Sequence, residues 1–108
     1  MTVPITPEGS LLLAARALQT AADQAEDDTR TGRATYATET HIKVLLWLCA
    51  SLLGKGKDLR STCPSVRSVH ALLQQAETEL RRFPIGDYPA GTTDVVIGLC
   101  DLIRESRP

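Results

Sequence analysis

The sequence predicts an all-α protein that folds as a compact four-helix single domain. Apolar side chains recur at intervals of three and four residues in four separate stretches, which is the spacing of one face of a helix. Leu (15) and Ala (12) dominate the composition, and both are strong helix formers. A chain of 108 residues is close to the commonest domain size. We therefore expect residues 1–108 to form one helical domain with a flexible N-terminus of about residues 1–6.

The first helix is predicted from residue 7 to about residue 26. Thr6 can cap its start, Pro7 suits the first helical position, and Glu8 favours the positive end of the helix dipole. Its apolar residues are small and fall on one narrow stripe, which would let another helix pack closely. The members of this stripe are Leu11, Ala14, Ala15, Leu18, Ala21, Ala22 and Ala25.

An acidic run closes this first helix, at Asp23, Glu26, Asp27 and Asp28. Carboxylates at the negative end of a helix are locally unfavourable. The sequence leaves two outcomes open. The helix end frays, or the charges are offset by Arg30, Arg33 or a basic partner.

The second helix, from about residue 35 to 53, is unusually apolar. Nine of the ten residues 44–53 are apolar, yet the run is far shorter than the ~20 residues needed to span a bilayer. Its apolar arc is roughly twice the ~100° that a surface helix needs. We therefore predict that this helix is central or lies at a homodimer interface, using the residues Ile42, Leu45, Leu46, Cys49, Leu52 and Leu53 as the dimer or core seam.

Trp47 falls outside even this broad arc. On a helical wheel it shares a flank with Tyr36 and Lys43. Tyr and Trp are enriched at binding hot spots because they offer a large rigid surface at a low entropy cost. We predict a partner-binding strip made of Tyr36, Lys43 and Trp47. The alternative is that Trp47 covers the edge of the core under a loop.

The last two helices are predicted at residues 64–83, with Thr62 or Cys63 as the cap, and at about 93–105. Helix 64–83 carries a heptad-like seam, and the apolar residues of helix 93–105 lie on one side. Residues 92–97 contain enough β-branched side chains for a short strand. We favour a helix there because no second stretch offers a partner strand. The seam of helix 64–83 comprises Val66, Val69, Leu73, Ala76, Leu80 and Phe83.

The sequence argues against an enzyme, a metal site or a bound cofactor. Its candidate ligands show no C-x-x-C, H-x-x-x-H or similar spacing. Cys63 precedes a helix start, where a thiolate is favoured, so a cysteine enzyme is a third alternative. His70 lies too far along the same helix to act as its base. The metal-ligand candidates are Cys49, Cys63, Cys100, His41 and His70.

The alternative function from another class is a DNA-binding regulator that uses helix 64–83. Its basic segment, residues 55–67, would supply Lys55, Lys57, Arg60 and Arg67. Recognition helices read bases near their N-terminus. Against this, the net charge is −1, and Glu77 and Glu79 later on the same helix would repel phosphate.

These observations favour a small helical regulator that acts by protein–protein contact. We expect an inhibitor, antiactivator or antitoxin-type adaptor that docks a helix face on a larger protein, such as a transcription regulator. We also expect a homodimer and no membrane contact. No export signal is visible, so we expect reduced cysteines and a cytoplasmic location. No motif here is specific enough to indicate a known family.

Overall fold

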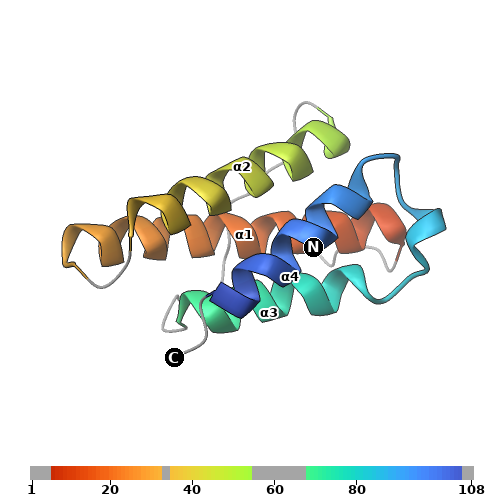
Figure 1. Ribbon diagram of the computed structural model, residues 1–108. Helices are drawn as coiled ribbons and strands as arrows, with labels where there is room; N and C mark the ends of the chain where they lie inside the picture. The colour runs from red at the N-terminus through yellow and green to blue at the C-terminus, as the bar shows by residue number, and fades with distance from the viewer. Residues whose placement is uncertain (1–5, 33–34, 55–67, 106–108) are drawn as a thin grey trace.

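The computed structural model describes residues 6–32, 35–54 and 68–105 and is helical almost throughout. Four α-helices follow one another in the chain, and a short 3-10 helix, η1, precedes the last (Figure 1). No strand occurs within these ranges, and residues 92–97 are helical. The predicted all-α four-helix architecture is therefore confirmed. The elements are α1 (Pro7–Arg30), α2 (Tyr36–Leu53), α3 (Val69–Leu80), η1 (Ile85–Asp87) and α4 (Thr92–Glu105).

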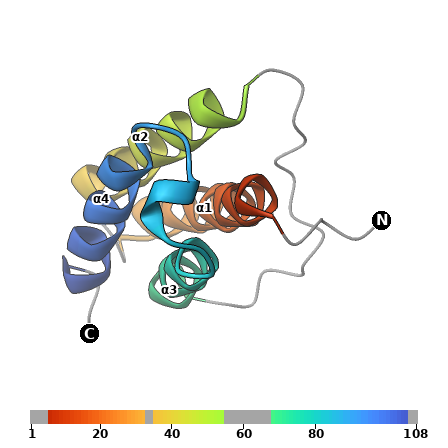
Figure 2. The same cartoon turned by 90° about the vertical axis from the view of Figure 1, so that its right-hand side faces the viewer.

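The first helix is the centre of the packing. α1 contacts both α2 and α3, and α4 closes the bundle by contacting the same two helices (Figure 2). Eleven residues of α1 are buried, against five of α2. The predicted central position of the second helix is thus taken by α1, because its Ala stripe lets two neighbours approach. The other half of that prediction, a dimer interface on α2, remains a prediction.

Side-chain caps set the starts of the first three helices. The Thr6 hydroxyl accepts a hydrogen bond from the Gly9 amide at 3.0 Å, as predicted. The Thr35 hydroxyl accepts one from the amide of Thr38 at 3.3 Å. Such caps satisfy amides that have no partner within the helix.

The predicted bounds of the third helix are wrong. The Ser68 hydroxyl accepts a hydrogen bond from the Ala71 amide at 3.2 Å, and Ser68 itself is extended. The helix therefore begins at Val69 rather than at residue 64; residues 62–67 lie outside the described ranges. It ends at Leu80 and not at Phe83, which lies in the following turn.

That turn is held by aromatic packing. The rings of Phe83 and Tyr88 meet edge to face with centroids 6.4 Å apart. The Tyr88 hydroxyl donates a hydrogen bond to the Glu79 carbonyl oxygen at 3.4 Å, and burial raises the pKa of Tyr88. These contacts bring the chain back from α3 to the start of α4.

The acidic end of α1 does not fray. The helix continues to Arg30, four residues beyond the predicted end. Arg30 pairs with Asp27 at 3.2 Å, and the Gln24 amide donates to Asp28 at 2.9 Å. Such pairs at i,i+3 and i,i+4 each stabilise a helix slightly. Local pairing therefore offsets the carboxylates, while Arg33 lies outside the described residues.

Two glycines let α4 lie close against α2. A Cβ atom added at Gly98 would lie 2.5 Å from Leu45 Cδ2, and one added at Gly91 would lie 3.3 Å from Leu52 Cδ2. The contact moves forward along α2 from Leu45 to Leu52 as it moves back from Gly98 of α4 to Gly91, the residue just before α4. The two helices are therefore antiparallel.

Candidate interaction surface

The predicted seam of the second helix lies inside the chain's own core. Ile42 and Cys49 are fully buried, and Leu45 and Leu53 are almost so. Leu46 and Leu52 are half-buried and pack against the same cluster, as does Leu48. Within the described part of the chain, these residues are covered without a second copy. The wide apolar arc is therefore mostly sheltered by α1 and α4.

A narrower stripe on the outside of α2 remains uncovered. Tyr36 is 73% exposed, Trp47 is 67% exposed and Val44 is 48% exposed. These three residues, called here the α2 stripe, share one helical face with the exposed Thr40 and Ser51. Such exposure of Trp47 argues against the alternative that it covers the core edge under a loop. All three predicted strip residues therefore lie on the surface, because Lys43 is exposed as well.

Lys43, the third predicted strip residue, is engaged within the chain. Its ammonium lies 3.4 Å from the Glu39 carboxylate and 3.9 Å from that of Glu26 on α1. The Glu39 side chain is only 7% exposed, and the Lys43 ammonium is the cation that pairs with this buried group. Lys43 thus joins α2 to α1. The sequence could show the i,i+4 pairing with Glu39 but not the approach of Glu26.

We expect Lys43→Met to destabilise the fold by about 1 kcal/mol. The change leaves the buried Glu39 carboxylate without its nearest cation, and Lys43 is half exposed, so water offsets part of the loss. Urea unfolding followed by circular dichroism measures the effect. In a Glu39→Gln background, the same change should cost almost nothing. Equal costs in both backgrounds would contradict the assigned role of Lys43.

Ile97 of α4 is a surface residue that sequence reasoning missed. It is 55% exposed and directly precedes Gly98, the point of closest contact with α2. Asp94 and Asp101 lie one turn before and after it, and both are exposed. The sequence could have indicated this exposure, because on a helical wheel Ile97 lies outside the apolar face that α4 presents to the core.

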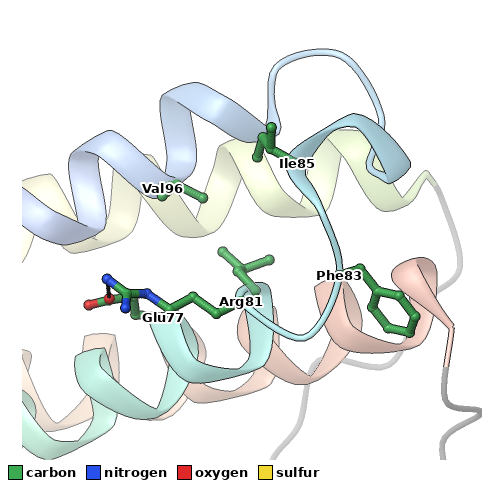
Figure 3. A pocket seen from close by; sticks show the side chains of 6 residues that line it. Glu77, Arg81, Phe83, Ile85 and Val96 are labelled. Atoms are coloured by element: carbon green, nitrogen blue, oxygen red, sulfur yellow. Dashed lines mark ion pairs between the residues drawn. The ribbon is translucent and has the colours of Figure 1, made fainter.

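A shallow pocket of about 240 Å³ lies between α3, η1 and α4 (Figure 3). Glu77 and Arg81 form an ion pair at its edge. Because these two charges neutralise one another, the pocket offers apolar contact and little else. Its remaining lining residues are Leu80, Phe83, Ile85 and Val96.

No group of three His, Cys, Asp or Glu side chains is placed to hold a metal ion within ranges 6–32, 35–54 and 68–105. Burial raises the pKa of the Cys49 thiol to about 12, so it is protonated at neutral pH. Cys63 and the predicted DNA-contacting residues Lys55, Lys57, Arg60 and Arg67 lie outside the described residues.

The same ranges contain no helix whose length and apolar character would let it traverse a bilayer. No protein-family model, curated protein or solved structure matches the chain.

Proposed function

We propose that this protein regulates a larger protein by binding it through the outer face of α2. The proposal rests on one observation: Trp47 is two-thirds exposed, in line with Tyr36 and Val44, on a helix whose opposite face is core. The regulator would be an inhibitor, antiactivator or antitoxin-type adaptor, and its target a protein such as a transcription regulator. It would act in the cytoplasm, without catalysis and without a cofactor.

The contrast with the two aromatic residues that lie off the α2 stripe supports this proposal. Phe83 and Tyr88 pack against each other, and Tyr88 is buried. Trp47, the largest apolar side chain, is left in water. Contacts of exposed aromatic residues with a partner carry much of the energy of many interfaces. The α2 stripe is thus the best-supported docking surface among the described residues.

Two other predictions, self-association and DNA binding, are supported less well than docking through the α2 stripe. Self-association through α2 remains a prediction, although the seam residues that motivated it are covered by the chain's own core. Light scattering of the purified chain tests it directly. The DNA-binding alternative depends on residues 55–67, which are not described, so no structural observation favours it.

Replacing Trp47 with Ala should abolish capture of the partner while leaving the fold intact. Affinity capture from a native lysate, with the wild-type chain and the variant side by side, identifies the protein that depends on Trp47. Calorimetry with that purified protein should then show binding about thirtyfold weaker, equivalent to about 2 kcal/mol, as for an interface hot spot.

Ile85→Ala is the matched control for this experiment. Ile85 is an exposed apolar residue on η1, beside the pocket and off the α2 stripe. It should leave capture unchanged, and circular dichroism should show that both variants fold. Retention of every partner by the Trp47→Ala variant would reject the α2 stripe as the docking surface.

A further inference from the structure

The side of α4 that is turned toward α2 carries a row of carboxylates. At about 100° per residue, Asp94, Asp101 and Glu105 fall between Ile97, which faces outward, and Gly98, which faces α2. All three acidic residues are exposed. Arg104, which lies 3.6 Å from Asp101, falls on the opposite side of Ile97. These carboxylates, called here the α4 acidic row, therefore flank the α2 stripe.

The opposite flank of the stripe carries carboxylates as well. There Lys43 lies between Glu39 of its own helix and Glu26 of α1. One cation thus faces two carboxylates, and Glu26 is more than half exposed. The α2 stripe is therefore bordered by net negative charge on both sides.

We propose that the partner segment received by this surface is an amphipathic helix with basic flanks. This inference rests on the proposed docking role of the α2 stripe and names the chemistry of its ligand. The apolar face of the incoming helix would cover Val44 and Trp47 in the manner of helix-in-groove recognition. Its Lys or Arg residues would meet the α4 acidic row and Glu26, which orients the helix and speeds its association.

The same charges disfavour a second copy on this surface. If two α2 helices met face to face in antiparallel orientation, the α4 acidic row of one copy would lie beside that of the other. In parallel orientation, the row would meet the flank on which Glu26 and Glu39 share the cation Lys43. Like charges brought together at an interface weaken it. Charge complementarity therefore selects a basic partner.

Three synthetic 18-residue peptides test this inference on the full chain. Each has Leu at three- and four-residue spacing, and its flanking positions are all Lys, all Gln or all Glu. Trp47 is the chain's only tryptophan, and its emission should move to shorter wavelength when it is covered. We expect the Lys peptide to bind at least tenfold more tightly than the Glu peptide, and the difference to shrink with added salt.

Matched variants tie the preference to the acidic row. Asp94→Asn combined with Asp101→Asn should weaken binding of the Lys peptide about fivefold, since exposed ion pairs contribute modestly. Asp87→Asn combined with Glu8→Gln removes the same charge elsewhere and should leave binding within twofold. Circular dichroism confirms that both double variants fold.

Equal binding of the Lys and Glu peptides, or equal effects of the two double variants, would overturn this inference. So would an emission shift that appears on concentrating the chain alone, because a second copy would then cover Trp47. If no peptide binds but Trp47→Ala still loses its captured partner, only the charge assignment fails. If capture is also unchanged, the proposed function fails too.

Discussion

Gly98→Val should destabilise the fold by about 3 kcal/mol. The added Cβ would lie 2.5 Å from Leu45 Cδ2 and 3.2 Å from Cδ1, closer than carbon atoms pack. Leu45 is almost fully buried and has little room to move aside. Overpacking of this kind typically costs about 1–3 kcal/mol, and Val gains little helix propensity over Gly to offset it. Urea unfolding followed by circular dichroism measures the change.

Two further variants show whether the loss arises at the contact between α2 and α4. Gly86→Val should cost less than about 0.5 kcal/mol, because nothing lies within 4 Å of a Cβ atom at that position. Combining Gly98→Val with Leu45→Ala should cost clearly less than the sum of the two single changes, since the introduced valine side chain would occupy space that Leu45 vacates. Strict additivity would mean that the two residues do not meet.

Stability should fall steeply above pH 9 because of Cys49. Burial raises its pKa from the ordinary value of 9.0 to about 12. Below pH 9 the thiol is protonated in both states and stability is unaffected. Between pH 9 and 12 the unfolded chain releases a proton that the folded chain retains, so the free energy of unfolding falls by about 1.4 kcal/mol per pH unit. The total loss approaches about 4 kcal/mol.

Comparison with Cys49→Ala isolates this effect. The substitution removes the thiol, so the stability curve of the variant should be flatter than that of the wild type between pH 9 and 11. Tyr88, whose pKa burial also raises, adds a decline in the same direction to both proteins. Unfolding in urea at several pH values gives the two curves. Parallel curves would show that the Cys49 thiol ionises equally well in the folded chain.

Local signals in the sequence were sufficient for the helices but not for all of their ends. Thr6 and Pro7 marked the start of α1 correctly, because a cap and a first-turn Pro act within a few residues. The same reasoning placed the start of α3 at Pro64, although Ser68 is the residue that caps it. Pro64 and Ser68 are both residues that can mark a helix start, and local sequence alone does not decide which of two such residues is used.

Packing order was harder to predict than helix existence. The broad apolar arc of α2 suggested a central helix, yet α1 took that place through its Ala stripe. The proximity of Leu45 to Gly98 depends on α4 returning antiparallel to α2, which local periodicity does not encode.

The candidate surface was partly predictable for the same reason. The helical wheel placed Trp47 off the apolar arc but left open whether it covered the edge of the core; in the structure it is exposed. The pairing of Lys43 with Glu26, and the approach of Gly98 on α4 to Leu45 on α2, required the arrangement of three helices.

The exposure of Trp47 also determines how this molecule can be observed by optical methods. An indole that is already in water in the native state changes its surroundings little when the chain unfolds. Its fluorescence should consequently be a poor monitor of denaturation. Folding followed by this fluorescence alone would show only a small change in signal. Trp47 is therefore a natural fluorescent label that reports little on folding but should respond when a ligand covers the α2 stripe.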